Sequence, residues 1–340
     1  MNFDFSDDQQ AIKRTAKDLI ADRFKFERVR ELAEAGAYDD DAWKELCGLG
    51  WPVIFIEEQY GGQGLGVVEL VILMEELGYA LAPVPYLSNA AAGLMIQAAG
   101  SEEQKQRWLP GIASGELRGA AGLVRGDEAK LVPDADSADL IVLCGGDARH
   151  VVERSAADVE PVETMDSTRR YARVRANGAG DLLEGDHRPG MSAAVLAVAA
   201  ELTGVAQRAM EMAVEYARDR KQFGRPIGAY QAVSHRCAQM LLETEGARSA
   251  TYWGAWTADA EPATVELAAS MANAYASDAG WRVCSSSLQV HGGIGFTWEH
   301  DLHFFLKRAK VDALLWGSAS EHRERVAQMS AVGEAAAAPA

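Results

Sequence analysis

Apolar residues recur at spacings of three and four along most of this chain, which predicts a protein built mainly from helices. Ser6 precedes an acidic first turn with Gln9 three residues on, so a capped helix should run from there to about Phe26. Further helical patterns cover residues 41–49, 67–81, 88–99 and 102–109. Together these segments predict a helical N-terminal domain over residues 1–115.

The helical period fades after Gly115, and a segment punctuated by glycine follows. Short apolar runs in it predict strands at residues 140–144, 151–152, 159–162 and 171–174. We therefore predict a reduced middle β domain over residues 116–190. Its core should be thin, because aromatic and long apolar residues are few.

Helical periodicity returns at Met191 and continues to about residue 332. The candidate helices cover residues 191–220, 229–258, 262–288, 298–312 and 318–330. Long helices rich in Ala and Met indicate a C-terminal four-helix bundle over residues 191–332, followed by a frayed tail over residues 333–340. The predicted fold class is thus mainly α with a small β domain.

Composition narrows the range of partners. A formal net charge of −17 over 340 residues argues against general binding to nucleic acid or to a membrane surface. The four cysteines are far apart in the sequence, which does not suggest a disulfide framework. The N-terminus lacks the basic-then-apolar order of a signal peptide, and no apolar run approaches the ~20 residues of a membrane helix. We therefore expect a cytoplasmic protein. His300 and His303 have zinc-like spacing but no further ligand, so we predict no metal site.

The stretch from Ala217 to Gln231, ARDRKQFGRPIGAYQ, ends one helix and begins the next. Cations are favourable at a helix C-terminus, so a helical hairpin with a solvated basic corner explains the pattern. A second interpretation is also open. Arg220, Gln222 and Phe223 combine a planar cation, an amide and an aromatic ring, which suits a phosphorylated ligand that bears a ring.

Six motifs, in order along the chain, make it resemble an acyl-CoA dehydrogenase, a flavoprotein that removes two hydrogens from an acyl-CoA thioester. They are LGWPVIFIEEQYGGQGLG from Leu49, MEELGYALAP from Met74, GSEEQKQRWLPGIASGEL from Gly100, RKQFGRPIGAYQ from Arg220, LQVHGGIGFTWEH from Leu288 and LKRAK from Leu306.

The resemblance implies FAD bound where two subunits meet, held partly by each subunit. The positions that would reach the neighbour's FAD are Arg220, Gln222 and Phe223 of the R-x-x-F-G motif, Gln231 at the start of the next helix, and Gln289, Gly292 and Gly293 of the Q-x-x-G-G motif. Ser318, at the family's threonine position, could add a hydroxyl contact.

The chain departs from the family at the catalytic base, a glutamate that removes the proton alpha to the thioester carbonyl. Trp316 and Ala194 occupy the family's two glutamate positions, and neither side chain can accept a proton. Glu201 and Asp312 are the carboxylates that lie nearest in sequence. We therefore assign no catalytic residue to this chain.

The middle segment also departs, because it lacks the aromatic residue expected against the flavin ring. This chain thus keeps the FAD contacts that face a neighbour while the contacts to its own FAD are in doubt. That asymmetry resembles the short subunit of heteromeric α2β2 acyl-CoA dehydrogenases. The resemblance implies a longer, glutamate-bearing partner, an acyl-CoA substrate for which a steroid side-chain ester is one candidate, and an electron acceptor such as an electron-transfer flavoprotein.

Two alternatives stay open from the sequence. The chain could be a self-sufficient, homo-oligomeric dehydrogenase with a relocated base such as Glu201. It could also be a non-catalytic scaffold that has kept the fold and lost flavin.

Overall fold

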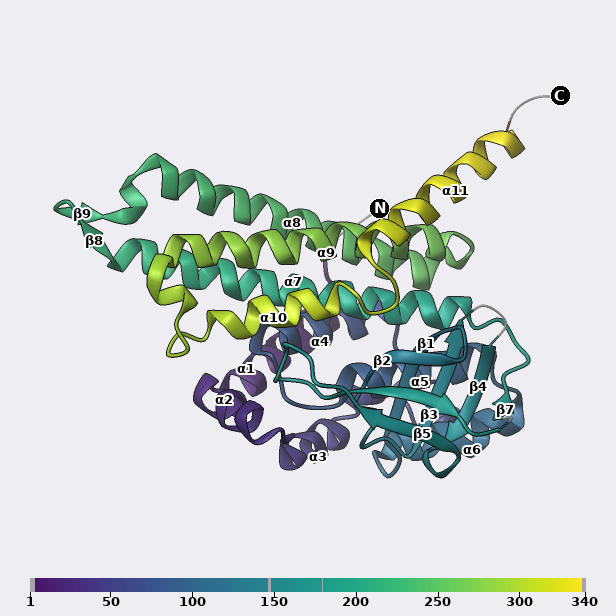
Figure 1. Cartoon of the computed structure of the whole chain (residues 1–340). Coiled ribbons are helices and arrows are strands. Elements are labelled where there is room, and N and C mark those ends of the chain that lie inside the picture. Colours follow the sequence, from purple (N-terminus) through teal and green to yellow (C-terminus); the bar gives the residue numbers. More distant parts are fainter. Residues whose placement is uncertain (1–3, 146–147, 179, 338–340) are drawn as a thin grey trace.

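The computed structural model describes residues 4–145, 148–178 and 180–337, and its order is helices, then a sheet, then long helices (Figure 1). This confirms the predicted fold class. The N-terminal helices are α1 (Asp7–Arg23), α2 (Phe26–Ala35), α3 (Asp40–Gly48), α4 (Val67–Ala80), α5 (Tyr86–Ala99) and α6 (Glu102–Ser114). Two short 3-10 turns, η1 (Trp51–Val53) and η2 (Glu58–Tyr60), lie between α3 and α4.

The capping box at Ser6 forms as predicted. Its hydroxyl accepts a hydrogen bond from the Gln9 backbone N–H at 3.2 Å, and the Gln9 side chain accepts one from the Ser6 N–H at 3.0 Å. Helix α2 was not predicted, although its buried Val29, Leu32 and Ala33 have helical spacing.

The middle of the chain forms one seven-stranded sheet in the order β5-β6-β2-β1-β3-β4-β7, in which β1 and β3 are parallel and the other neighbours antiparallel. The strands are β1 (Gly119–Arg125), β2 (Glu128–Pro133), β3 (Leu140–Gly145), β4 (Ala148–Glu153), β5 (Ala157–Pro161), β6 (Tyr171–Ala176) and β7 (Asp181–Leu182). Strands β3 to β6 match the predicted runs. The prediction missed β1, β2 and the two-residue β7; GAAGLVR in β1 is rich in small residues, and neither it nor EAKLVP in β2 has a clear alternation.

One face of this sheet packs a core made largely of alanine and valine, as the sparse long apolar residues led us to expect. The other face is covered by α5, since Ala121, Val142 and Cys144 belong to the same core as that helix. The sheet therefore packs on the helices through this face, with Leu140 and Tyr171 among the larger side chains of the contact.

The long helices that follow are α7 (Arg188–Asp219), α8 (Gln231–Ala260), α9 (Val265–His291), α10 (Leu302–Asp312) and α11 (Ala319–Ala337). Helix α7 is long and apolar enough to cross a bilayer, but 89% of its most apolar window is buried inside the protein. It packs closely on α4, because a Cβ atom added at Gly204 would lie 1.9 Å from the Glu75 carbonyl oxygen. Helix α7 is thus the central helix of a folded core.

Helix α11 corrects the predicted C-terminal boundary. It runs to Ala337, past the predicted end at residue 330, and part of the tail expected to fray is helical. Alanine has the highest helix propensity, which accounts for the extension. Residues 338–340 lie outside the described part of the chain. The domain boundaries at residues 115 and 190 stay a prediction.

A buried ionic cluster joins the sheet to the long helices. It consists of Asp166 and Arg169 from the loop between β5 and β6, Glu201 from α7, and Arg308 and Asp312 from α10, all at least nine-tenths buried. Arg169 donates to Glu201 at 2.5 and 3.0 Å and to Asp312 at 3.1 Å. Arg308 donates to Asp166 at 2.6 Å and to Glu201 at 2.8 Å. Three segments that are remote in sequence therefore meet at two guanidinium groups.

The ionic cluster holds three carboxyl groups against two cations. Burial by itself raises the pKa of Glu201, but the charges of Arg169 and Arg308 outweigh burial and hold that pKa below its ordinary value. Burial and the neighbouring charge of Glu201 raise the pKa of Asp312 well above its ordinary value. With Asp166 and Glu201 ionised and Asp312 protonated, the ionic cluster is electrically neutral, as its burial requires.

Replacing Glu201 should therefore cost much more than replacing Asp312. We expect Glu201→Gln to lower the free energy of unfolding by about 3–5 kcal/mol, because it leaves buried positive charge uncompensated. Asp312→Asn keeps the shape and neutrality of a protonated carboxyl, so its effect should stay within about 1 kcal/mol. Urea denaturation of the two variants measures both values. The reverse ranking would contradict the assigned charges.

The raised pKa of Asp312 also predicts a pH dependence. A carboxyl group whose pKa is higher in the folded state than in the unfolded state loses its stabilising effect as pH rises above about 3.9. The stability of the natural protein relative to Asp312→Asn should thus fall as pH rises above about 3.9. Unfolding curves at several pH values measure this difference, and a rise with pH would show that Asp312 is ionised.

Candidate functional site

The end of α7 and the start of α8 are joined by a β-hairpin, which we call the R220 hairpin (residues 220–230). Its strands are β8 (Lys221–Gln222) and β9 (Arg225–Pro226), followed by a short 3-10 turn, η4 (Ile227–Ala229). The two residues of its tight loop, Phe223 and Gly224, have φ values of 51° and 81°. Positive φ at both positions is what a two-residue type I′ hairpin loop needs, but it is unfavourable for a bulky residue such as phenylalanine.

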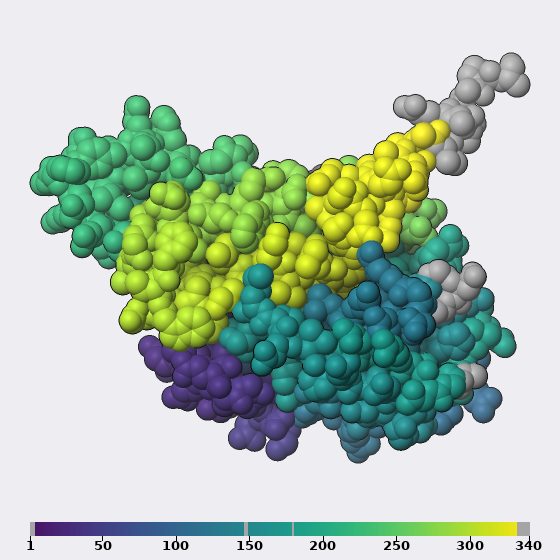
Figure 2. Space-filling view, viewed as in Figure 1, coloured from purple at the N-terminus to yellow at the C-terminus, as the bar shows by residue number. Residues whose placement is uncertain are grey.

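The R220 hairpin presents its predicted ligand-binding side chains to solvent. The Phe223 ring is 92% exposed, and Arg220, Gln222 and Gln231 are also exposed. Arg220 makes no side-chain hydrogen bond or ion pair within the described part of the chain. Figure 2 shows this end of the bundle as a green lobe that projects from the body.

Contacts to backbone carbonyls hold the R220 hairpin and do not involve the Arg220 guanidinium. Ile227 N–H donates to the Arg220 carbonyl at 2.8 Å, and the Tyr230 hydroxyl donates to the Gln222 carbonyl at 3.2 Å. The Arg225 guanidinium lies 4.1 Å from the centre of the Tyr230 ring. Ile227, Tyr230 and Arg225 thus stabilise the hairpin, whereas the Arg220 and Phe223 side chains face solvent.

The Q-x-x-G-G motif lies beside the end of α7. Gln289 is exposed near the end of α9, and Gly292 and Gly293 follow that helix. A Cβ atom added at either glycine would meet nothing within 4 Å, and Gly292 has a φ of +63°. The backbone here is open to approach by a ligand, as contacts to a pyrophosphate require.

His291 connects the two motifs. Its ring is buried, its Nδ1 lies 2.8 Å from the Ser287 carbonyl, and it stacks on Tyr216 with the ring centres 4.7 Å apart. Tyr216 lies one turn before Arg220 on α7. These contacts give His291 a structural role. They also place the second motif at the same end of the bundle as the R220 hairpin.

Ser318 is not brought together with the other predicted residues. It precedes α11, near the sheet, whereas the R220 hairpin lies at the far end of the bundle (Figure 1). Its hydroxyl donates to Glu321 at 2.8 Å and accepts from the Glu321 backbone N–H at 3.3 Å. Ser318 therefore caps α11.

The two positions at which the family carries its catalytic glutamate are buried, and neither holds a residue that can accept a proton. Ala194 is fully buried on α7. Trp316 is 4% exposed, has a φ of 61°, and its indole Nε1 has no hydrogen-bond partner in the described residues. Each of the carboxylates nearest in sequence, Glu201 and Asp312, belongs to the ionic cluster.

Glu201 cannot serve as a base in this arrangement. Both of its oxygens accept hydrogen bonds from guanidinium groups, and its lowered pKa reflects a carboxylate that binds a proton weakly. Asp312 has the opposite problem, because burial and the neighbouring charge of Glu201 raise its pKa and favour the protonated form. The sequence did not reveal the two arginines that impose these states, although Arg308 lies inside the LKRAK motif.

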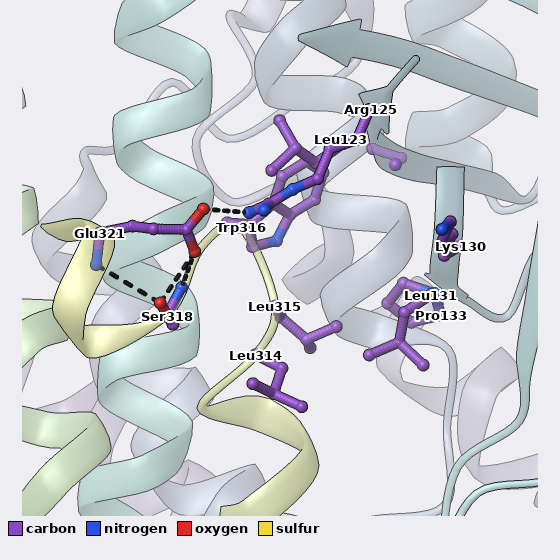
Figure 3. A pocket seen from close by; sticks show the side chains of 12 residues that line it. Leu123, Arg125, Lys130, Leu131, Pro133, Leu314, Leu315, Trp316, Ser318 and Glu321 are labelled. Carbon is purple, nitrogen blue, oxygen red and sulfur yellow. Dashed lines mark hydrogen bonds and ion pairs between the residues drawn. The ribbon is translucent and has the colours of Figure 1, made fainter. Parts of the chain in front are cut away.

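Trp316 lines a small cavity between the sheet and the loop after α10, which we call the Trp316 chamber (Figure 3). Its volume is about 260 Å³, below the roughly 300–1,000 Å³ of common small-molecule pockets. Arg125 from β1 pairs with Glu321 from α11 at 2.7 Å across the lining of this chamber. This chamber is small and partly closed by an ion pair, whereas the R220 hairpin and the glycines after α9 are open to approach by another molecule.

Comparison with known proteins agrees with the fold. The acyl-CoA dehydrogenase N-terminal domain model matches residues 6–116, and the C-terminal domain model matches residues 190–331. Acyl-CoA dehydrogenase IpdE2 of Mycobacterium tuberculosis is 34% identical over 323 residues, covering 94% of this chain and 96% of that protein.

Two solved structures are similar over almost the whole chain. The ChsE4-ChsE5 complex from Mycobacterium tuberculosis matches with a TM-score of 0.88 and 26% identity, covering 100% of both chains. The Tcur3481-Tcur3483 steroid ACAD, a G363A variant, matches with a TM-score of 0.86 and 27% identity, covering 96% of this chain and 99% of that one. This chain belongs to the acyl-CoA dehydrogenase family.

Proposed function

We propose that this chain is the short subunit of a heteromeric acyl-CoA dehydrogenase and supplies part of the FAD site of a longer, glutamate-bearing partner. One observation carries the proposal. Arg220, Gln222 and Phe223, which would reach a neighbour's FAD, are exposed, and the Arg220 side chain has no partner in the described chain, while the position for the chain's own base is buried and filled by Trp316. Similarity to the ChsE4-ChsE5 complex supports assembly with a related chain.

In this proposal the R220 hairpin binds the ADP part of the partner's FAD. Arg220 pairs with the pyrophosphate through its guanidinium fork, and Gln222 and Gln231 add hydrogen bonds from their amides. Phe223 covers an apolar part of the dinucleotide. The backbone at Gly292 and Gly293 lets the phosphates approach closely, with Gln289 beside them.

The reaction is alpha,beta-dehydrogenation of an acyl-CoA thioester. Bound FAD supplies the acceptor for the hydrogen that leaves the beta carbon. In this proposal a glutamate of the partner removes the alpha proton, since neither Glu201 nor Asp312 is free to act as the base. This chain orients the cofactor, and electrons pass on to an acceptor such as an electron-transfer flavoprotein.

A steroid side-chain CoA ester is the substrate candidate, because a structural neighbour at 27% identity is described as a steroid ACAD. The alternatives are weaker. A self-sufficient enzyme would need Glu201 as its base, and both oxygens of that carboxylate are occupied. A scaffold that has lost flavin gives no reason for an exposed phenylalanine at positive φ.

Co-expression tests the proposal directly. We expect the isolated chain to purify without flavin, and the chain co-expressed with a longer relative that carries the glutamate to purify as a yellow, active complex. Flavin absorbance per heterodimer and acyl-CoA turnover are the measurements. Turnover by the isolated chain with its own tightly held FAD would refute the assignment, and flavin-free protein from both preparations would favour the scaffold.

Arg220→Ala should weaken FAD retention by the complex about tenfold or more, because it removes a charged hydrogen bond to phosphate. Arg220→Lys should restore part of the loss, since it keeps the charge without the planar fork. Arg218→Ala is the matched control, with the same change of charge two residues upstream on α7. FAD release measured by fluorescence compares the three, and equal retention in Arg220→Ala and Arg218→Ala would contradict the role of Arg220.

A further inference from the structure

The two motifs that would meet the ADP part of FAD lie on different helices, and a pair of stacked rings joins them. The R220 hairpin follows α7, whereas Gly292 and Gly293 follow α9. The Tyr216 ring of α7 stacks on the His291 ring of α9, with the ring centres 4.7 Å apart and the planes 26° apart. This stack therefore lies between the two halves of the proposed site.

Tyr216 is tied to the R220 hairpin through its backbone. Its carbonyl accepts a hydrogen bond from the Arg220 N–H at 2.9 Å, which closes the C-terminal end of α7. The Arg220 carbonyl in turn accepts from the Ile227 N–H at 2.8 Å, across the base of the hairpin. The position of Tyr216 thus sets where the hairpin, and with it the Arg220 side chain, leaves the helix.

His291 is tied to the glycine turn. It is the last residue of α9, directly before Gly292. Its Nδ1 lies 2.8 Å from the Ser287 carbonyl and must donate, because a carbonyl oxygen can only accept. A Cβ atom added at Gly295 would lie 2.9 Å from the His291 Cβ, and the His300 ring meets the His291 ring with centres 4.5 Å apart. The ring is therefore fixed by its own helix, by the turn and by Tyr216.

These contacts use His291 as a neutral ring. Burial lowers its pKa and the neighbouring His300 adds to this effect, while the hydrogen bond to Ser287 opposes it. The side chain is only 4% exposed, so a neutral ring needs no buried counter-ion. His291 is thus suited to holding the two motifs in place and not to supplying charge to a phosphate.

We propose that His291 is a positioning residue for the ADP part of the partner's FAD. Through its stack on Tyr216, it holds Arg220 and the backbone of Gly292 and Gly293 in one fixed arrangement, so that a single pyrophosphate meets both. A site held in its binding arrangement before the ligand arrives binds more tightly, because less freedom is lost on binding. This inference rests on the proposed function, since it concerns the same FAD site.

Variants of the stack in the co-expressed complex test the proposal. His291→Ala should weaken FAD retention about tenfold, and Tyr216→Leu, which removes the same stack from α7, should have a similar effect. His291→Phe should restore most of the loss, because it keeps a flat, neutral ring against Tyr216. His235→Ala, at an exposed histidine on α8, is the matched control and should retain FAD normally.

FAD release is followed by fluorescence at a temperature at which every variant is folded, as thermal unfolding of each complex shows. Two results would overturn the proposal. One is equal retention in His291→Ala, Tyr216→Leu and the His235→Ala control. The other is retention in His291→Phe as weak as in His291→Ala, which would show that the ring stack is not what matters.

A double-mutant cycle with Arg220→Ala separates positioning from a general loss of stability. Without the guanidinium there is less to position, so His291→Ala should weaken retention only about twofold further in that background. A full additional tenfold loss would show that His291 acts independently of Arg220 and would refute the inference. If Arg220→Ala alone leaves retention unchanged, the proposed function fails and this inference fails with it. If Arg220→Ala weakens retention and the stack variants do not, only this inference fails.

Discussion

The pairing of two buried arginines with three carboxyl groups is the interaction on which this structure depends. Buried guanidinium groups are tolerated only where carboxylates meet them at close range, so Arg169 and Arg308 fix the relative positions of the β5–β6 loop, α7 and α10. The core on one face of the sheet is made largely of alanine and valine and contributes few large apolar contacts. The ionic cluster makes up for that by specifying one arrangement with strong, directional contacts.

The same cluster separates the two ends of the bundle by function. At the end near the sheet, it occupies Glu201 and Asp312 and orients α10, whose C-terminus leads into the loop with Trp316. The charged groups of the cluster at that end are paired within the chain. At the other end, the Arg220 side chain has no partner in the described chain, Phe223 is exposed, and the backbone at Gly292 and Gly293 is open. In the proposed function, this open end is the one that meets another molecule.

The sequence predicted what depends on local patterns. Helical spacing located the long helices, and the serine and glutamine at the start of α1 formed the expected capping box. The connector between α7 and α8 was found from its glycines, proline and cations. Strands β1 and β2 were missed because small residues carry no alternating signal. The roles assigned to Arg220 and its neighbours in cofactor binding stay predictions.

The ionic cluster could not be predicted, because its members come from segments up to 146 positions apart that the fold alone brings together. Charged residues at Asp166 and Arg169 look like ordinary loop residues in the sequence. Glu201 offered one hint, since it lies within an apolar stretch of α7 where an unpaired carboxylate would be costly. That hint indicates a buried partner without identifying it.

The closed state of Trp316 makes the loss of the catalytic base hard to undo in evolution. A glutamate restored at this position would bring a carboxylate into a buried site, which is costly without a partner. Arg125 already pairs with Glu321, so the new carboxylate would find no free counter-ion there. In the proposed heteromer, a chain with tryptophan at this position therefore keeps relying on the glutamate of its partner, because a single substitution does not restore a working base.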